Sequence, residues 1–452
     1  MLRNNFSAFA LLASAGLLSA QNPTASLASA WVLPPIAQPA QPQTLAVRAG
    51  RLFDPKSGAL LANQIILIRG DRIVDVGAAV QIPSNARIID LSGATVLPGL
   101  IDTHLHVMDG NPLTAPGGPG ILPGTPNAAP TLQYRELIAL TNAQRDLTAG
   151  FTTVVDLMSH GGWYGTVDLR NAINNGLVQG PRMQVAGPGI VNTNKGNVPF
   201  QLLPAAPIAN VGAQVANGPW AVREAVREQA HYGVDWIKIY STEEFYFKPD
   251  GTMVNTPSFT LEETQAIVDE AHRKGLKVAC HAYGGEGLHN CISAGVDVPT
   301  HGVDLDDESL KMLADKHLPL TSTFFDLSIE DAQEMKRWGN SRWRMMEKSW
   351  KKALAAGVTL PFGSGAGPFP HGTQVDQFAY FVKWGMAPVQ ALRSATSIAA
   401  DLIGWQDRVG TVEKGKFADL VAVPGDPLTD ITEMSRIKFV MRGGQVVRND
   451  VK

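Results

Sequence analysis

The chain has 452 residues, of which 44% are hydrophobic and 17% are charged, and its formal net charge at pH 7 is −3. This length exceeds what one small core uses, so one large domain with a smaller domain beside it is expected. The slightly negative charge and the lack of a Lys/Arg-rich block argue against a nucleic-acid partner.

The N-terminus has the pattern of an export signal. An arginine near the start is followed by the short apolar run Phe6–Leu18 and then by small residues. We predict a signal peptide over residues 1–30, cleaved after Ala20 or Ala30, and an unstructured proline-rich leader over residues 31–43. An uncleaved anchor is the alternative, but the run is short for a transmembrane helix. The mature protein is expected to be periplasmic or secreted, without a membrane partner.

Short strands with glycine turns occupy both ends of the mature chain. The first set runs through residues 44–97 and the second through residues 408–449. Gln64–Ile68 and Ala418–Val423, for example, are apolar segments in these two sets, as expected for strands. We predict that the two sets form one small β-sandwich domain built from both ends of the chain.

Between these ends, residues 98–407 alternate strands with helices. One helix is expected from Thr131 to Thr148, another begins at the capping sequence Thr260–Glu263, and the last runs from Pro388 to just before Gly404. The predicted strands are residues 95–101, 151–156, 183–186, 236–240, 277–280, 297–300, 318–323 and 359–362. Eight strands that alternate with helices are typical of a (β/α)8 TIM barrel, so the predicted fold class is α/β.

Two histidines close the first barrel strand. His104 and His106 follow the apolar run Val96–Ile101, and side chains two residues apart point to the same face of a strand. At the C-terminal mouth of a barrel, neutral imidazoles at this spacing suit one divalent metal ion. This pair alone leaves the alternative of structural histidines open.

Three further strands carry residues suited to a metal site. Lys238 lies within the apolar fourth strand, and His281 and His301 end the fifth and sixth strands. The carboxyl ends of barrel strands meet at one rim, so these side chains are expected to converge with the first two histidines. The lysine alone would extend to solvent. Beside metal-binding histidines, a lowered lysine pKa would favour reaction with CO2 to give a carbamate that bridges two metals.

The chain contains two cysteines, Cys280 and Cys291. A large core does not require a disulfide, although an oxidising compartment would permit one. Because Cys280 precedes His281, its side chain alternates away from the site, and we predict that it is a buried core residue.

Several motifs resemble those of the metal-dependent amidohydrolase superfamily. They are Pro98–His106, Ile237–Ile239, His281–Gly284, His301–Gly302 and Gly415–Leu420. The resemblance is to the binuclear branch with a carboxylated lysine, which includes imidazolonepropionase-like, Xaa-Pro dipeptidase-like and ochratoxin-hydrolysing members.

The resemblance implies a ligand set and an activity. His104 and His106 would bind one metal, His281 and His301 the other, and carboxylated Lys238 would bridge them. The implied reaction is hydrolysis of an amide bond by a hydroxide activated by two divalent ions. Zn²⁺ suits the ligands best, and cobalt or manganese would also fit.

One position departs from the family pattern. The family has an aspartate after strand eight, where this chain has Gly365. The resemblance gives that aspartate the roles of metal ligand and proton carrier, and losing a general acid/base lowers the rate about 10²- to 10⁴-fold. Three explanations are open: a deliberately inactivated variant, a natural enzyme with weak activity, or a natural non-catalytic barrel that binds a metal or ligand. For weak activity, Asp326 is the one candidate acid that sequence places on the rim.

Aromatic residues near the strand ends suggest a cleft for a substrate with a bulky apolar or aromatic acyl group. The alternative is that these loop residues only pack against the protein. The candidate substrate contacts are Tyr240, His160, His371, Trp163 and Phe325. We predict a small-molecule amide substrate, either an N-acyl amino acid or a dipeptide, with ochratoxin-like compounds among the candidates. The alternative is a ligand-binding protein on an inactive hydrolase scaffold. The resemblance also favours a homo-oligomer.

Overall fold

The computed structural model describes residues 44–109, 131–193, 213–324 and 327–451. The predicted signal peptide and leader lie outside these ranges. Within them, no helix combines the length and the apolar character that crossing a membrane requires.

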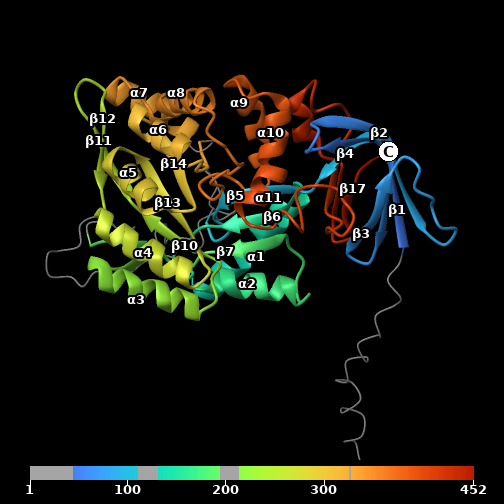
Figure 1. The fold of residues 1–452 in the computed structure, drawn as a ribbon, viewed down its shortest axis with the longest axis horizontal. Coiled ribbons are helices and arrows are strands. Elements are labelled where there is room, and N and C mark those ends of the chain that lie inside the picture. The colour runs from blue at the N-terminus through green and yellow to red at the C-terminus, as the bar shows by residue number, and fades with distance from the viewer. Residues whose placement is uncertain (1–43, 110–130, 194–212, 325–326, 452) are drawn as a thin grey trace, which may run out of the picture. The chain divides into compact units, whose positions relative to one another are not determined.

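Strands from both ends of the described chain form one seven-stranded sheet (Figure 1). In sheet order they are β17 (Gln445–Asn449), β16 (Phe439–Arg442), β15 (Leu420–Val423), β4 (Arg87–Pro98), β1 (Thr44–Asp54), β2 (Ala59–Arg69) and β3 (Arg72–Gly77). Strand β4 joins the two sets, because it pairs in parallel with β1 and antiparallel with β15. Val47, Ile66 and Phe439 are fully buried in a shared apolar core, as alternating strands with one inward face predict.

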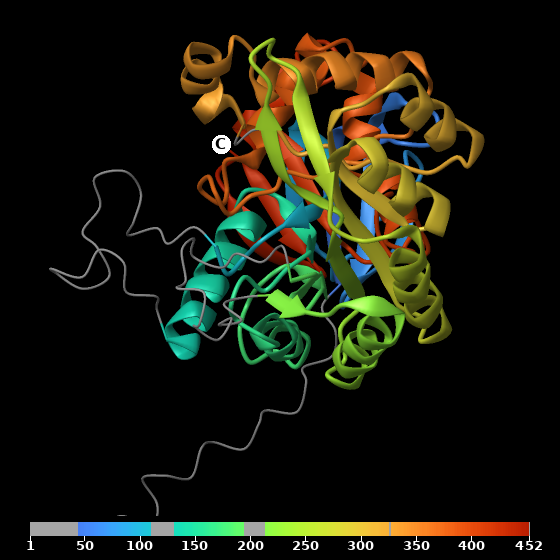
Figure 2. The ribbon, with the colours of Figure 1, turned by 90° about the vertical axis from the view of Figure 1, so that its left-hand side faces the viewer.

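Parallel strands of the middle region form the barrel wall (Figure 2). They are β5 (Leu100–Leu105), β6 (Phe151–Asp156), β7 (Arg182–Val185), β8 (Gly189–Val191), β10 (Trp236–Tyr240), β13 (Lys277–Gly284) and β14 (Val298–Asp304). One sheet has the order β5-β6-β7 and another the order β14-β13-β10-β8-β9, where β9 is Ala213–Val215. A bridge between Ala186 and Trp236 joins these sheets. The predicted strand 95–101 is divided at Gly99 between β4 and β5.

The predicted seventh and eighth barrel strands are not continuous strands. Thr321 forms an isolated bridge with β14, and Ala366 forms one with β5. These contacts place both segments in the barrel wall, but Pro319 and Pro361 each lack the backbone N–H that a regular ladder needs. The ring is therefore closed by irregular backbone where sequence predicted regular strands.

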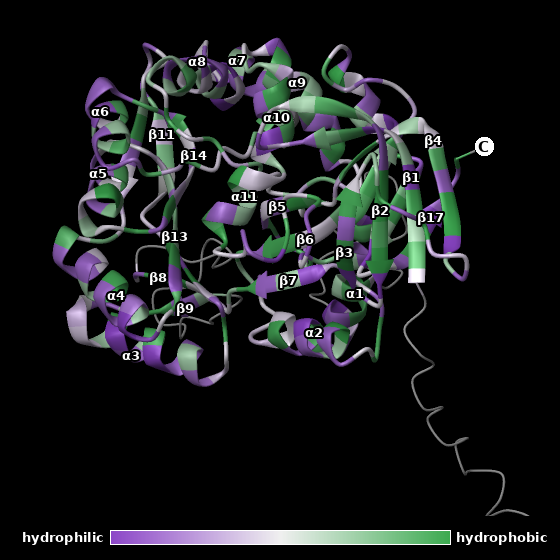
Figure 3. Ribbon diagram, turned by 45° about the vertical axis from the view of Figure 1, so that its right-hand side comes forward, coloured by the Kyte–Doolittle hydropathy of each residue, from purple (hydrophilic) through white to green (hydrophobic). Residues whose placement is uncertain are grey.

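Helices alternate with the strands. They are α1 (Leu132–Thr148), α2 (Gly165–Asn174), α3 (Gly218–His231), α4 (Leu261–Arg273), α5 (Gly285–Ala294), α6 (Asp307–Asp315), α7 (Leu327–Trp338), α8 (Arg342–Ala355), α9 (Gln377–Lys383), α10 (Pro388–Ser394) and α11 (Ser397–Leu402), with short 3-10 helices η2 (Gln374–Asp376) and η3 (Ile431–Arg436). Most of them carry hydrophobic and hydrophilic residues side by side in Figure 3, as helices with one buried face do.

The predicted helix starts are confirmed, and one predicted helix is divided. Thr131 caps α1, and Thr260 forms a complete capping box with Glu263 at the start of α4. The predicted last helix is broken between α10 and α11. Between these two helices, the carbonyl of Ala395 accepts a hydrogen bond from the N–H of Ile101 in β5 at 2.8 Å. This carbonyl therefore bonds to a barrel strand at the point where the predicted helix is broken.

An antiparallel hairpin follows β10 and consists of β11 (Thr242–Phe247) and β12 (Met253–Pro257) (Figure 2). Phe247 stacks on Trp338 of α7 with ring centroids 4.8 Å apart, and Phe245 lies 5.7 Å from Tyr283 of β13. The hairpin is thereby packed against elements that surround the barrel mouth.

Candidate active site

The four predicted histidines lie together at the carboxyl ends of β5, β13 and β14. Ring centroids are 5.2 Å apart for His104 and His106, 5.1 Å for His104 and His301, and 4.1 Å for His281 and His301. His104 is fully buried and His301 is partly buried. Residues separated by about two hundred positions in the sequence thus form one continuous imidazole cluster.

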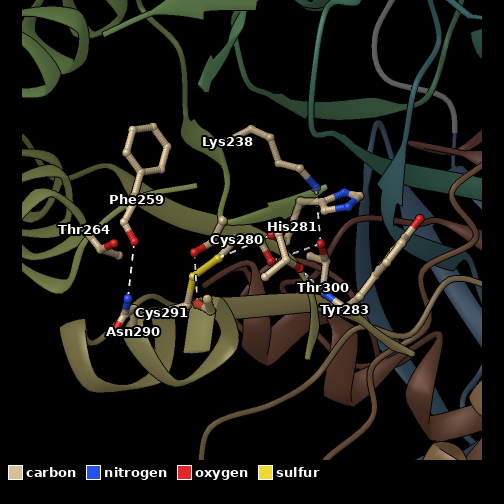
Figure 4. Close-up of a disulfide and its surroundings, with 12 residues drawn as sticks. Lys238, Phe259, Thr264, Cys280, His281, Tyr283, Asn290, Cys291 and Thr300 are labelled. Carbon is tan, nitrogen blue, oxygen red and sulfur yellow. Dashed lines mark hydrogen bonds between the residues drawn. A yellow bond between two sulfur atoms is a disulfide. The ribbon is translucent and has the colours of Figure 1, made fainter. Parts of the chain in front are cut away.

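Lys238 is fully buried in β10 beside this cluster. Its Nζ lies 3.4 Å from Nε2 of His104 and donates to Oγ1 of Thr300 at 3.3 Å. Figure 4 shows its side chain extending toward Thr300 and His281. The alternative of a solvent-exposed lysine is therefore excluded, and a buried ammonium among imidazoles is costly unless its charge is lost or compensated.

The environment keeps three of the histidines neutral. Burial, followed by the nearby Lys238 ammonium, lowers the pKa of His104 and of His301 well below the usual value. Burial and the neighbouring His160 do the same to the pKa of His106. Neutral imidazole is the form that ligates a metal ion.

The donor atoms of the cluster have the chemistry of metal ligands. Nδ1 of His104, Nδ1 of His106 and Nε2 of His301 are buried without a hydrogen-bond partner among the described residues. Such atoms are rare in proteins, and an ion would satisfy them. In the described ranges, however, no three His, Cys, Asp or Glu side chains are arranged as a completed metal site. The residues therefore suit a divalent metal by donor type, while the coordination geometry is not defined.

Gly365 lies in the same pocket as the cluster, with the left-handed backbone torsion φ of 70°. Its N–H donates to the carbonyl of His104 at 2.7 Å. A Cβ built at this position would lie 3.0 Å from Cβ of Thr323. A side chain here is strained, although aspartate tolerates this torsion better than most residues. The backbone at this position is therefore well suited to glycine.

Asp102 ties the first barrel strand to the segment around Gly365. Its Oδ1 accepts hydrogen bonds from the N–H groups of His104 and Ser364, both at 3.0 Å. Burial raises the pKa of Asp102 to about 7. The sequence assigns Asp102 no specific role, although its spacing of two before His104 places it on the same strand face.

A cavity of about 180 Å³ adjoins the histidine cluster and is called here the histidine pocket. Its lining residues are His106, Asp109, His160, Lys238, Tyr240, His281, Tyr283, His301, Thr323, Leu327, Gly365 and Pro368. Tyr240 and His160, two of the predicted substrate contacts, line this pocket. Trp163 is 41% exposed and does not line the pocket, whereas Phe325 and Asp326 lie outside the described residues.

Two aromatic residues of the pocket are fixed by neighbours. Nδ1 of His160 lies 3.1 Å from Oδ2 of Asp109, and its ring lies 4.4 Å from that of His106. Tyr240 stacks on His281 at 4.7 Å and donates to Sδ of Met158 at 2.9 Å. These contacts hold both rings at the pocket wall.

Sequence reasoning missed Asp109, Tyr283 and Thr323 as pocket residues. Tyr283 follows His281 by two positions on β13, so strand alternation was a usable signal for it. Asp109 lies in the turn after β5, and Thr323 in the irregular seventh segment, where strand periodicity gives no guidance. Their positions depend on the closed barrel.

His371, a predicted substrate contact, does not line the histidine pocket. Its side chain is completely buried, with Nδ1 2.8 Å from Oδ2 of Asp146 and Nε2 donating to the carbonyl of His106 at 3.1 Å. Burial opposes a charge, but the Asp146 carboxylate and the two hydrogen bonds raise the pKa of His371 above its usual value. With both ring nitrogens engaged, His371 supports the backbone at His106 from outside the pocket.

Cys280 and Cys291 form a disulfide between β13 and α5 (Figure 4). Both residues are fully buried, so the prediction of a buried Cys280 is confirmed, but the residue is paired and not a free core thiol. Since Cys280 directly precedes His281, the disulfide tethers the strand that presents this histidine to the neighbouring helix.

Comparison with known proteins places this geometry in a family. A family model described as "Amidohydrolase family" matches residues 95–447. The chain belongs to the amidohydrolase family. Its fold, a TIM barrel with a smaller second domain, and its class, a hydrolase acting on amide bonds, are thereby confirmed. Members of this family generally bind divalent metals.

Individual relatives of this amidohydrolase include enzymes with named substrates. The present chain is 26% identical over 429 residues to ochratoxinase of Aspergillus niger, and the match covers 89% of this chain and 86% of that protein. It is 25% identical over 413 residues to imidazolonepropionase of Micrococcus luteus, covering 83% and 94%. A crystal structure of a Xaa-Pro dipeptidase with bound methionine in the active site matches with a TM-score of 0.78 and 30% identity, covering 90% of this chain and 100% of that one.

Proposed function

We propose that this amidohydrolase cleaves the amide bond of N-acyl amino acids or dipeptides, in the manner of a carboxypeptidase or prolidase, with ochratoxin-like amides among its candidate substrates. The observation that carries the proposal is the meeting of four histidines and one buried lysine around a single pocket. Similarity to a Xaa-Pro dipeptidase and to ochratoxinase supports this substrate class.

The histidine cluster would hold two divalent metal ions, of which Zn²⁺ suits imidazole and oxygen ligands best. His104 and His106 would hold one ion, His281 and His301 the other, and Lys238 would bridge them as a carbamate formed with CO2. Bound there, the ions would activate water and polarise the scissile carbonyl. The burial of Lys238 next to His104 supports this assignment, because burial disfavours the ammonium form of the lysine. The neutral amine is the form that reacts with CO2.

The other pocket residues would bind and orient the substrate. The rings of Tyr240 and His160 line the pocket, while Tyr283, Leu327 and Pro368 supply an apolar wall for the acyl group. The pocket is small, so a bound substrate would displace water from the cluster. His371 would act only through His106, whose backbone it holds.

Gly365 points to impaired activity. The described residues that line the pocket include one carboxylate, Asp109, which is paired with His160. A proton carrier at position 365 is lacking, and its loss lowers the rate about 10²- to 10⁴-fold. The same observation favours the second candidate function, a metal- or ligand-binding barrel without catalysis.

Metal analysis and a substrate panel test the proposal. The purified chain and its Gly365→Asp variant are measured for bound metal and for hydrolysis of N-acyl-phenylalanine and Xaa-Pro dipeptides. We expect about two metal ions per chain and slow hydrolysis that rises at least about 100-fold in the variant. Bound metal without any gain in the variant supports the binding protein. Neither metal nor hydrolysis contradicts the amidase proposal.

The carbamate has a test of its own. With ¹³C-bicarbonate, we expect a carbamate resonance that is absent in Lys238→Arg, because a guanidinium stays protonated and does not react with CO2. We expect the metal content of Lys238→Arg to be lower than that of the wild type as well. A metal-loaded wild-type protein that lacks the resonance would show that Lys238 is not carboxylated.

We also propose that the protein is exported and forms a homo-oligomer. The predicted signal peptide and the Cys280–Cys291 disulfide support export, since disulfides persist in oxidising compartments. Fractionation of the source cells tests the compartment, and light scattering coupled to size exclusion tests the oligomer. Protein that remains wholly cytoplasmic, or a monomer at working concentrations, contradicts the respective proposal.

A further inference from the structure

A second and larger cavity lies apart from the histidine pocket. Its walls come from the second half of α1, from the loop over residues 371–375, and from the segment between Met434 and Arg448. Its volume is about 610 Å³, compared with about 180 Å³ for the histidine pocket. No described residue lines both cavities, so a ligand of this cavity is distinct from the amide substrate.

Four cationic side chains line this cavity, which is called here the basic groove. They are Arg145 on α1, Arg436 at the end of η3, Lys438 and Arg448 on β17. Among the described residues, no aspartate or glutamate lines it. Like charges gathered on one concave surface create a positive potential that attracts anions. This concentration contrasts with the net charge of −3 for the whole chain.

Two of these cations are held in place by carboxylates that lie outside the groove. Arg436 lies 2.5 Å from Glu433 and 3.4 Å from Asp430, and Arg448 lies 2.6 Å from Asp450. A guanidinium has five N–H donors, so these ion pairs orient it and leave other donors for a ligand. Such fixed guanidinium groups bind planar or tetrahedral oxyanions with little loss of side-chain entropy.

The other two cations lack this compensation. Arg145 and Lys438 form no ion pair with a carboxylate in the described ranges. Lys438 is partly buried, so its charge is partly removed from water without a counter-ion. An anion between α1 and the C-terminal segment would compensate both charges at once.

We propose that the basic groove binds a small polyanion that carries phosphate groups. The two uncompensated charges of Arg145 and Lys438, together with the remaining N–H donors of Arg436 and Arg448, match a multiply charged ligand better than a monocarboxylate. Arginine pairs with phosphate oxygens in a bidentate manner.

Calorimetric titration tests the groove directly. Orthophosphate and pyrophosphate are titrated at constant ionic strength into the metal-loaded protein and into the double variant Arg145→Gln/Lys438→Gln. We expect both anions to bind, with pyrophosphate tighter because it spans more of the cations. The double variant is expected to weaken pyrophosphate binding at least about tenfold, since two charge-assisted contacts are lost.

A matched variant separates specific binding from bulk charge. Arg69→Gln with Lys274→Gln removes the same two charges at exposed positions elsewhere, and we expect less than about a twofold effect. Circular dichroism and thermal unfolding verify that both variants are folded.

The proposal is overturned if the wild type binds neither anion, or if both double variants lose binding equally. It is also overturned if Arg145→Gln/Lys438→Gln binds like the wild type, because the anion then occupies another site such as the histidine pocket. The titration needs no amide hydrolysis, so its failure is distinguishable from failure of the proposed function.

Discussion

At the scale of single residues, Gly365 and His371 both hydrogen-bond to the backbone of the segment that carries His104 and His106. Gly365 donates its N–H to the carbonyl of His104, and His371 donates to the carbonyl of His106. Both residues therefore fix the backbone that carries the first two imidazoles, although neither presents a ligand atom to the cluster. Substitutions at the two positions test different properties, namely proton transfer and support of the strand.

Replacing Gly365 with aspartate is expected to raise activity and lower stability together. The left-handed torsion and the 3.0 Å approach to Thr323 should reduce the free energy of unfolding by about 1–2 kcal/mol. The added carboxylate should increase amide hydrolysis about 10²- to 10⁴-fold. Gly365→Asn is the matched control, because it has the same shape and strain but carries no proton acceptor. Equal activities of the Asp and Asn variants would exclude proton transfer as the missing function.

Replacing His371 with glutamine is expected to weaken the site without touching its ligands. The change leaves the Asp146 carboxylate buried beside a neutral group, which should lower the free energy of unfolding by about 3 kcal/mol. We expect metal content after dialysis to fall as well, since His106 loses its support. His289→Gln, which removes a partly exposed histidine paired with Asp306, should change stability by less than about 1 kcal/mol. Unchanged metal retention in His371→Gln would show that the support is dispensable.

At the scale of elements, α3 and α4 are joined by a buried carboxylate. Glu270 on α4 has a side chain that is 2% exposed and accepts from Arg227 at 2.9 Å and 3.1 Å and from Arg223 at 3.4 Å. The hydrogen bonds from Arg227 outweigh burial and lower the pKa of Glu270 to about 2. This contact connects the helices that flank β10, the strand that carries Lys238.

The Glu270 contact predicts a specific pH dependence of stability. Because its folded pKa of about 2 lies below the unfolded value of 4.5, the stabilisation is complete above pH 4.5 and is lost as the pH falls through 2. Glu270→Gln should therefore lower the free energy of unfolding by about 2–3 kcal/mol at pH 7. In urea titrations this difference should narrow progressively below about pH 4.5. Glu262→Gln, at an exposed position of the same helix, should show little difference at either pH.

At the scale of the whole described molecule, the terminal sheet and the barrel share one ionic and aromatic contact. Arg182 of β7 donates to both carboxylate oxygens of Asp419 at 2.7 Å and 3.1 Å. The ring of Phe417 lies between Arg182 and Arg72 of β3, at 3.4 Å and 3.5 Å from their guanidinium carbons. The two parts are therefore expected to unfold as one cooperative unit.

Removing the charge of Asp419 tests this cooperation. Asp419→Asn leaves the partly buried guanidinium of Arg182 without its counter-ion and should lower the free energy of unfolding by about 2–3 kcal/mol. A single transition by both circular dichroism and tryptophan fluorescence is expected to persist at a lower denaturant midpoint. Asp407→Asn, at an exposed ion pair, should leave the midpoint nearly unchanged. Two separate transitions in the wild type would contradict a cooperative unit.

Much of the fold and part of the site follow from the sequence alone. Periodicity and capping residues located the regular strands and the starts of α1 and α4, because these signals are local. The spacing of His104 and His106 placed both rings on one strand face. The seventh and eighth strands were predicted too regularly, since Pro319 and Pro361 interrupt their ladders while isolated bridges still hold both segments in the barrel wall.

What only the tertiary structure decided concerns groups that meet across the barrel. The burial of both nitrogens of His371, the pairing of Cys280 with Cys291, and the entry of Tyr283 and Asp109 into the pocket each depend on an element distant in sequence. The basic groove likewise combines α1 with the C-terminal segment. Local sequence determines which side chains leave a strand or helix on a given face. Packing of remote elements determines what those side chains meet, and therefore whether they act as ligands, supports or binding surfaces.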